Sequence, residues 1–217
     1  MIERSIAVET HGRYLVEPPA GDGPAPLLVG FHGYSESADV QIDRLRRIPG
    51  SARWRLVSIQ GLHRFYQRRS DEVVASWMTR QQRELAIADN LLYVAAVIDD
   101  VAREWPTTQP LVLAGFSQGV AMAFRAAASS ARPVSAVIAV GGDVPPELDS
   151  AALKRIPSAL VCHGAGDPVY APATFENDVR RLREAGVNVR PIEFDGGHEW
   201  AAAVIDAASR LLEELHP

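Results

Sequence analysis

Short runs of apolar residues alternate along this chain with longer segments whose apolar positions recur at helical spacing. The shorter segments predict strands at residues 27–31, 54–59, 110–114, 134–140, 158–162 and 188–194, and the apolar run at 110–114 predicts a buried one. The helical spacing predicts helices near residues 40–48 and over residues 84–104, 120–128, 171–185 and 200–215. Repeated strand–helix units favour a mostly parallel sheet with helices on both faces, which is an α/β fold.

Three segments fall outside this alternation. Residues Ser5–Glu9 and Arg13–Glu17 flank a short turn and predict an antiparallel β-hairpin at the start of the chain. The segment from Gln60 to about Arg80 is expected to be a long loop, and Gly141–Ile156 is too short to form a substantial lid. No repeat or linker interrupts the pattern, so we expect a single domain over residues 1–217.

The pentapeptide Gly115-Phe116-Ser117-Gln118-Gly119 stands between a predicted strand and an alanine-rich predicted helix. A G-x-S-x-G motif in this position is typical of a nucleophile elbow, in which a serine occupies a sharp strand-to-helix turn. The glycines leave room for the close backbone packing that such a turn requires. Ser117 is therefore the candidate nucleophile.

A serine hydroxyl needs a base to take its proton and an acid to orient that base. Asp167 follows the strand at residues 158–162, and His198 follows the strand at residues 188–194. The order Ser117, Asp167, His198 is the order in which this elbow places its partners. Asp143 and Asp195 also lie at strand ends and compete for the role of the acid. The structural alternatives are that Asp167 only begins a turn and that His198 only precedes a helix.

Two backbone N–H groups are needed to stabilise an oxyanion. One belongs to Gln118, directly after the candidate nucleophile, and the other is expected from Tyr34 in the loop after the strand at residues 27–31. His32 is expected to brace that loop through hydrogen bonds. The candidate substrate-binding residues are Tyr34, Phe65, Tyr66, Trp77 and Met78, with ordinary packing under a long loop as the alternative.

Composition and charge narrow the classes of partner. The net charge of -5 argues against a nucleic-acid partner, which needs a clustered positive surface. Two arginine-rich stretches, residues 44–47 and 64–69, are expected to be solvated surface, with an anion or lipid-headgroup site as the alternative. The histidines have no paired ligand spacing, so neither a metal nor another cofactor is expected. The candidate nucleophile, base and acid suit acyl transfer, so the predicted partner is a small-molecule ester or thioester, and a homodimer is an open alternative to a monomer.

The location follows from the cysteine count and from the apolar segments. Cys162 is the single cysteine, which fits a reducing compartment, and its strand-like setting predicts a small core residue. The start of the sequence lacks the apolar stretch of a secretory signal, and no segment has the length of a membrane span. We therefore expect a cytoplasmic protein without stable membrane insertion.

The motifs together resemble the phospholipase/carboxylesterase family of α/β-hydrolases, which includes acyl-protein thioesterases and bacterial carboxylesterases. The resemblance covers about residues 25–215 and is carried by four motifs: His32-Gly33, Gly115-Phe116-Ser117-Gln118-Gly119, His163-Gly164-Ala165-Gly166-Asp167-Pro168-Val169 and Gly197-His198. It implies an α/β-hydrolase fold and a serine esterase acting on short- to medium-chain acyl groups. The implied site has Ser117, Asp167 and His198 as its triad and Tyr34 and Gln118 as its oxyanion donors.

The sequence also departs from the family pattern. The family's H-G-L-G-D reads here His32-Gly33-Tyr34-Ser35-Glu36, its W-F-D segment is Trp77-Met78-Thr79, and Val120 replaces the last glycine of G-F-S-Q-G-G. These are positions at which acyl chains would be gripped, so the acyl preference stays open. An acyl thioesterase, a lysophospholipase and a non-catalytic binding protein with the same fold remain as alternatives.

Overall fold

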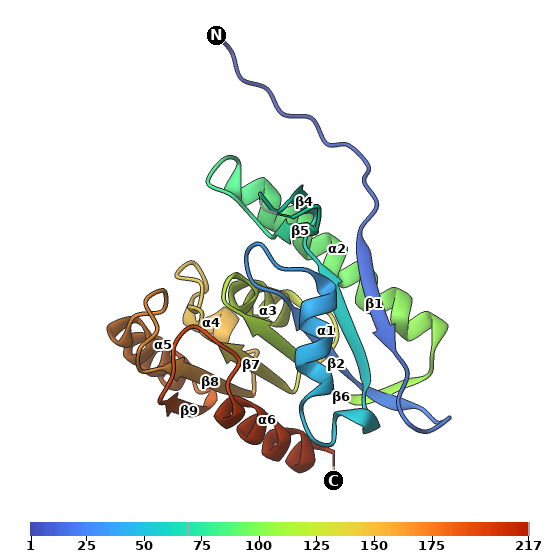
Figure 1. Ribbon diagram of the computed structural model, residues 1–217, viewed down its shortest axis with the longest axis vertical. Helices are drawn as coiled ribbons and strands as arrows, with labels where there is room; N and C mark the ends of the chain where they lie inside the picture. The colour runs from blue at the N-terminus through green and yellow to red at the C-terminus, as the bar shows by residue number, and fades with distance from the viewer. Residues whose placement is uncertain (69, 217) are drawn as a thin grey trace.

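The computed structural model describes residues 1–68 and 70–216 of the chain. A seven-stranded sheet forms its centre, with the strand order β1-β3-β2-β6-β7-β8-β9 (Figure 1). The strands are β1 (Arg13–Glu17), β2 (Ala25–Phe31), β3 (Arg55–Gln60), β6 (Thr107–Phe116), β7 (Ala136–Val140), β8 (Ser158–Gly164) and β9 (Asn188–Phe194). Six of the seven run parallel, and β1 pairs antiparallel with β3. The predicted, mostly parallel sheet is confirmed.

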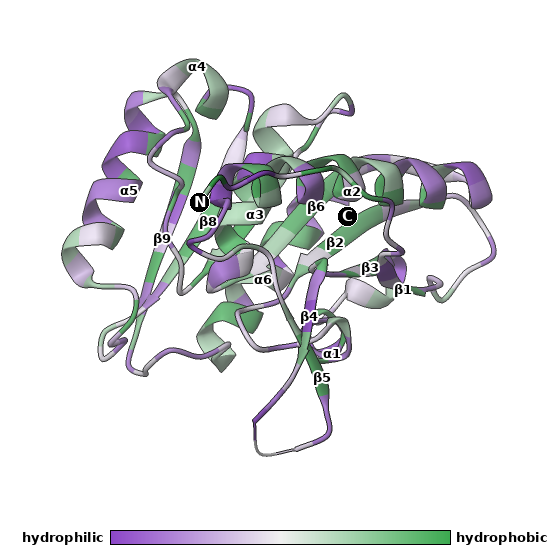
Figure 2. Ribbon diagram, turned by 90° about the horizontal axis from the view of Figure 1, so that it is seen from above, coloured by the Kyte–Doolittle hydropathy of each residue, from purple (hydrophilic) through white to green (hydrophobic). Residues whose placement is uncertain are grey.

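Helices cover both faces of the sheet. They are α1 (Ala38–Arg46), α2 (Arg83–Glu104), α3 (Gln118–Ser129), α4 (Ser150–Leu153), α5 (Pro172–Glu184) and α6 (Ala202–Leu215), and a short 3-10 helix spans Ser51–Arg53. Helices α2, α3 and α5 pack on one face, and α1 and α6 pack on the other. Figure 2 shows the apolar strands of the sheet between these two layers.

Side chains of one strand point alternately into the two layers. In β2, Leu27, Val29 and Phe31 join the core under α2 and α3, whereas Leu28 joins the core under α1. All seven residues of β2 are buried, as expected for a parallel strand that is covered on both faces. The apolar run at residues 27–31 therefore marked a central strand of the sheet.

The predicted N-terminal hairpin is wrong in one of its two strands. Arg13–Glu17 is a strand, but its antiparallel partner is β3. Residues 1–12 form no helix or strand and extend away from the sheet (Figure 1). The side chains of Ile6 and Val8 are exposed there, so the apolar alternation of Ser5–Glu9 covers no core.

The predicted long loop after β3 contains a second, two-stranded sheet. Strand β4 (His63–Tyr66) pairs antiparallel with β5 (Val73–Ser76). The backbone of Ala75 in β5 also bonds to the loop after β2, where it accepts from Ser35 N–H and donates to the Glu36 carbonyl. This hairpin is thereby joined to one wall of the site described below.

Four connections place chemistry-bearing loops at the same edge of the sheet. The carboxyl ends of β2, β6, β8 and β9 lie at this edge, because all four strands run parallel. The connection at residues 141–157 contains one four-residue helix, α4, so it forms no substantial lid. Among the helices in the described ranges, none has the length and apolar character needed to cross a bilayer.

Candidate active site

Ser117 occupies a strained turn between β6 and α3. Its backbone has φ 51° and ψ -121°, a conformation that costs a non-glycine residue about 1–3 kcal/mol. Close packing explains the flanking glycines: a Cβ on Gly115 would lie 2.5 Å from the Gly119 carbonyl oxygen, and a Cβ on Gly119 would lie 2.2 Å from the Phe31 carbonyl oxygen. The turn presents the serine hydroxyl at the carboxyl end of β6.

Ser117, His198 and Asp167 form one hydrogen-bonded relay. His198 Nε2 lies 2.9 Å from Ser117 Oγ, and His198 Nδ1 lies 2.8 Å from Asp167 Oδ2. The three residues come from loops after β6, β8 and β9, and Ser117 and Asp167 precede His198 by 81 and 31 positions along the chain. The edge of the parallel sheet brings them together, as their order predicts.

Asp167 is buried and fully hydrogen-bonded. Its Oδ1 accepts the N–H groups of Val169 at 2.7 Å and Tyr170 at 3.0 Å, which leaves Oδ2 for His198. Burial by itself raises the pKa of Asp167, but the hydrogen bonds with His198 and the two N–H groups bring that pKa below its usual value. An ionised carboxylate can only accept hydrogen bonds, so the proton lies on His198 Nδ1 and Nε2 is free to accept one.

The competing acids lie elsewhere. Asp143 and Asp195 are exposed, and within the described ranges neither makes a hydrogen bond to His198. Asp143 follows β7 and lines a cavity next to Ser117, whereas Asp195 follows β9. Of the three candidate acids, only Asp167 contacts the imidazole.

Two backbone N–H groups lie at the site with their hydrogen-bonding capacity unused. Gln118 is the first residue of α3, so its N–H has no acceptor within the helix. The N–H of Tyr34 donates to no other group in the part of the chain that the structure describes, whereas those of Gly33, Ser35 and Glu36 all have acceptors. Both predicted oxyanion donors are therefore available.

An ion pair holds the loop that carries Tyr34. Glu36 accepts the Gly33 N–H at 2.7 Å and binds Arg44 through both carboxylate oxygens at 2.6 Å. Burial alone would raise the pKa of Glu36, but Arg44 and the Gly33 N–H bring it below its ordinary value. The Arg44 guanidinium also stacks 4.0 Å above the Phe116 ring, next to the nucleophile. The arginines at residues 44–47 are thus not all solvated surface, whereas the second stretch, 64–69, ends at residue 69, which lies outside the described residues.

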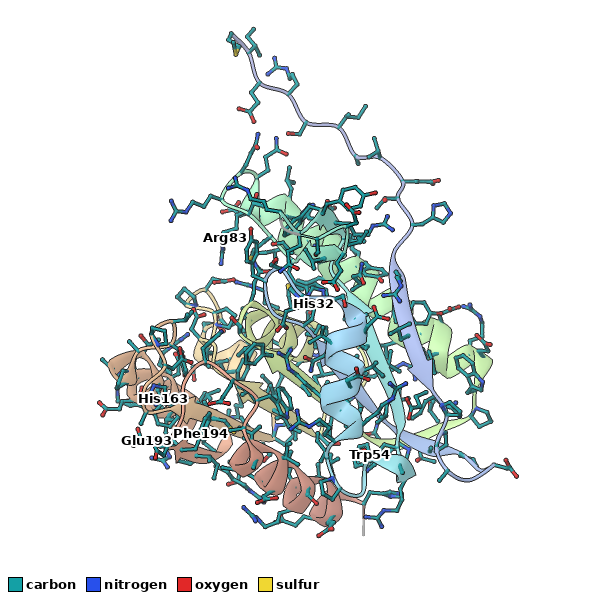
Figure 3. The ribbon with its side chains drawn as sticks, in the orientation of Figure 1. His32, Trp54, Arg83, His163, Glu193 and Phe194 are labelled. Carbon is teal, nitrogen blue, oxygen red and sulfur yellow. The ribbon has the colours of Figure 1, made fainter. Side chains whose placement is uncertain are left out.

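His32 and Trp77 form buried hydrogen bonds that support the loop carrying Tyr34. His32 is fully buried, its Nδ1 lies 2.7 Å from the Gly33 carbonyl oxygen, and its Nε2 accepts the Gly61 N–H at 3.0 Å. Burial lowers the pKa of His32, which favours a neutral ring. Trp77 Nε1 donates to the His32 carbonyl at 2.8 Å (Figure 3 labels His32 at this position). His32 therefore braces the loop.

Two cavities flank the serine. The first has a volume of about 450 Å³ and is lined by Gly33, Tyr34, Glu36, Arg44, Arg47, Phe116, Ser117, His198, Glu199 and Trp200. The second has a volume of about 440 Å³ and is lined by Ser117, Gln118, Gly141, Gly142, Asp143, Val169, Tyr170 and Thr174. Charged and polar side chains are prominent in both linings, so neither cavity is an apolar tunnel.

Only one of the five predicted substrate-binding residues lines a cavity next to Ser117. Tyr34 does so, and Phe65 stacks on it with ring centroids 5.8 Å apart. Tyr66 is 72% exposed on β4 and lines neither cavity. Met78 is half-buried and lies against α3, where its sulfur contacts Arg125.

The expectation for Trp77 requires a correction. Its side chain is 0% exposed and packs in the core against Phe31, with ring centroids 5.6 Å apart. A residue without exposed surface does not line an open pocket. Its backbone N–H donates to the Gln118 side chain at 2.9 Å, so Trp77 joins the end of β5 to the elbow.

Several lining residues were not predicted from the sequence. Arg44 lies on the last turn of α1 and Arg47 directly follows the helix, and the cluster of arginines was the available signal for both. Glu199 and Trp200 directly follow His198, so their proximity to it could have been anticipated. Thr174 at the start of α5 had no signal in the sequence, because only the fold brings it to the serine. In the described ranges, no three His, Cys, Asp or Glu side chains are grouped to hold a metal ion.

Comparison with known proteins relates most of the chain to one family. The model of the phospholipase/carboxylesterase family matches residues 18–216. No curated protein matches the sequence.

Solved structures share the fold at low sequence identity. Esterase PE8 superposes with a TM-score of 0.74 at 23% identity, covering 95% of this chain and 100% of its own. A Bacillus cereus carboxylesterase has a TM-score of 0.72 at 16% identity, covering 94% of each chain. Acyl-protein thioesterase 2 from Zea mays has a TM-score of 0.70 at 20% identity, covering 94% of this chain and 99% of its own. These likenesses confirm the predicted α/β-hydrolase fold.

Proposed function

Because this chain belongs to the phospholipase/carboxylesterase family, we propose that it is a serine esterase that hydrolyses carboxylic esters through an acyl-enzyme. The relay from Asp167 through His198 to Ser117, with contacts of 2.8 and 2.9 Å, is the observation that carries the proposal. A nucleophile and a base within hydrogen-bond reach, with the base oriented by a third group, are the requirements for this chemistry.

In the first half-reaction, Ser117 Oγ attacks the ester carbonyl carbon while its proton passes to His198 Nε2. The electron pair of the broken C=O π bond moves to the carbonyl oxygen, where the N–H groups of Tyr34 and Gln118 stabilise the negative charge. The intermediate then collapses, the bond to the alcohol oxygen breaks, and His198 gives the proton to the departing alcohol. The ionised Asp167 stabilises the imidazolium during this step.

In the second half-reaction, a water molecule takes the place of the alcohol. His198 removes a proton from the water as it attacks the acyl-enzyme, and the proton returns to Ser117 Oγ when the acid leaves. The oxyanion reforms in the same position, so the same N–H donors act twice. Activity is expected to fall on acidification, because a protonated His198 cannot accept the serine proton.

The two cavities favour small acyl groups. A long alkyl chain gains free energy by burying apolar surface at about 25 cal/mol per Å². The lining of the first cavity includes four charged side chains and only a few aromatic ones, so a long alkyl chain would find little apolar surface there. The charged residues are Glu36, Arg44, Arg47 and Glu199. We therefore propose short- to medium-chain esters as the substrate class, ahead of long-chain lysophospholipids.

Acyl-chain profiling tests this proposal. Initial rates are measured on p-nitrophenyl acetate, butyrate, octanoate and palmitate and on the matching thioesters, with Ser117→Ala as the control. We expect the highest kcat/KM for the short and medium oxygen esters and rates near background for Ser117→Ala. Faster thioester turnover would make the protein a thioesterase, and no turnover by a folded sample would favour the non-catalytic binding protein.

Four further expectations from the sequence stay predictions. They are the single domain over residues 1–217, the lack of a nucleic-acid partner, the cytoplasmic location and a possible homodimer. Cys162 is buried in β8, and burial raises the pKa of its thiol, which supports its assignment as a core residue.

A further inference from the structure

We propose that His163 is a positioning residue, which holds Asp167 in place through the backbone of Tyr170; the proposal rests on the function proposed above. His163 lies near the carboxyl end of β8, opposite Glu193 of β9 (Figure 3). It is fully buried and touches neither Ser117 nor His198 through a hydrogen bond. Its influence on the reaction must therefore pass through other residues.

The path from His163 to Asp167 has two hydrogen bonds. His163 Nε2 lies 2.9 Å from the carbonyl oxygen of Tyr170. The N–H of the same residue donates to Asp167 Oδ1 at 3.0 Å, next to the Val169 N–H at 2.7 Å. Both N–H groups depend on the conformation of residues 167–170, and His163 holds the end of that segment. The carboxylate then presents Oδ2 to His198.

The ring of His163 packs against two aromatic side chains. It stacks on Phe175 of α5, with centroids 5.0 Å apart and planes at 16°, and it meets the edge of Tyr170 at 74°. Since a carbonyl oxygen only accepts, Nε2 carries the proton in the contact with Tyr170. The contact with the Tyr170 carbonyl therefore sets the tautomer of His163 with its proton on Nε2.

The other ring nitrogen of His163 shows that packing alone does not explain a histidine at this position. His163 Nδ1 is buried and has no hydrogen-bond partner among the described residues, and a carboxylate oxygen of Glu193 lies 3.5 Å from it. A buried polar atom without a partner lowers the stability of the folded protein. An apolar side chain between Phe175 and Tyr170 would avoid that cost. The histidine is explained by the hydrogen bond that its Nε2–H donates to the Tyr170 carbonyl.

The phenol of Tyr170 is fixed as well, which confines the effect of His163 to the backbone. Its hydroxyl donates to Asp178 Oδ2 at 3.1 Å, and the same oxygen accepts the Val144 N–H at 2.9 Å. Burial raises the pKa of both Tyr170 and Asp178. When His163 is replaced, the Tyr170 side chain keeps this anchor while the carbonyl of residue 170 loses its donor.

Three variants separate a positioning role from a structural one. His163→Leu removes the donor, His163→Gln returns an N–H donor at a similar reach, and Phe175→Leu removes the stacking partner while the donor stays. We expect His163→Leu to lower kcat on p-nitrophenyl acetate about tenfold to a hundredfold, the size of effect that a small misplacement of a catalytic group produces. His163→Gln should recover most of this loss, and Phe175→Leu should lower the unfolding midpoint with little effect on kcat.

A double-mutant cycle with Asp167→Ala gives the decisive comparison. Once the acid is removed, nothing remains to be positioned, so His163→Leu should change kcat less than twofold in that background. An equal loss in both backgrounds, or an unchanged kcat in folded His163→Leu, would overturn the proposal.

A second readout is independent of turnover. The downfield proton resonance of His198 Nδ1–H reports its hydrogen bond with Asp167; it should persist in His163→Gln and shift or broaden in His163→Leu. If the native protein shows this resonance but hydrolyses no ester, the proposed function fails while the positioning role stands. An unaltered resonance in His163→Leu would refute the positioning role.

Discussion

Replacing Asp167 by asparagine separates the catalytic role of this residue from its structural one. The carbonyl oxygen of the introduced amide can still accept the N–H groups of Val169 and Tyr170, which in the native protein bond to Oδ1 at 2.7 and 3.0 Å. The amide nitrogen then faces His198 Nδ1 as a donor. To accept this hydrogen bond, His198 Nδ1 must carry a lone pair, so the imidazole proton moves to Nε2. There it points at Ser117 Oγ. The base is lost although the contacts remain.

The expected magnitude follows from these contacts. Loss of the acid in a relay of this kind lowers kcat about 10⁴-fold, which corresponds to about 5 kcal/mol of transition-state stabilisation. The two N–H bonds weaken because their acceptor is no longer charged, at a cost of about 1 kcal/mol each. We therefore expect a folded protein with a loss of activity far larger than its loss of stability.

The assay measures kcat on p-nitrophenyl acetate together with the urea midpoint. Asp195→Asn is the matched control, since Asp195 lies three residues before His198 and is exposed. That control should retain its activity to within about twofold, because surface changes of this kind have small effects. A retained kcat above a tenth of the native value in Asp167→Asn, or an equal loss in Asp195→Asn, would refute the assignment of the acid.

Two predictions concern the loop that carries Tyr34. Trp77→Phe removes the Nε1–H bond to the His32 carbonyl and part of a buried ring, so the free energy of unfolding should fall by about 1–3 kcal/mol, measured by urea denaturation; an unchanged midpoint would contradict the buried placement. Arg44→Gln removes the ion pair that lowers the pKa of Glu36. The stability from a lowered carboxyl pKa is present above about pH 4.5 and is lost as the pH falls. The difference in urea midpoint between Arg44→Gln and the native protein should thus shrink from pH 7 to pH 3, and a constant difference would argue against the pair.

The parts of the fold that could be predicted are those whose signal is local. Residues 110–114 were predicted as a strand and lie within β6, because an apolar run of that length next to a sharp-turn motif marks a strand without reference to its partners. The helix predicted over residues 84–104 begins at Arg83 and ends at Glu104. The order of Ser117, Asp167 and His198 was sufficient to predict that their side chains meet, because each residue follows a strand of the same parallel sheet.

The missed features depend on long-range pairing. The apolar alternation in Ser5–Glu9 resembles a strand, but the segment extends away from the sheet and does not pair with the open edge of β1 (Figure 1). The β4–β5 hairpin forms on a loop whose sequence has weak strand signals, and its contact with the loop after β2 is set by the fold. For the same reason the sequence left two possibilities for Trp77, lining the pocket or packing under the loop, and only the fold shows that it is buried.

Labelling with a fluorophosphonate probe tests the central claim most directly. The native protein, Ser117→Ala and Asp167→Asn are incubated with the probe, and any adduct is located by mass spectrometry. We predict a single adduct on Ser117 in the native protein, none on the alanine variant, and much slower labelling of Asp167→Asn. An adduct on another residue, or no adduct on a folded native sample, would contradict the assignment of Ser117 as an activated nucleophile.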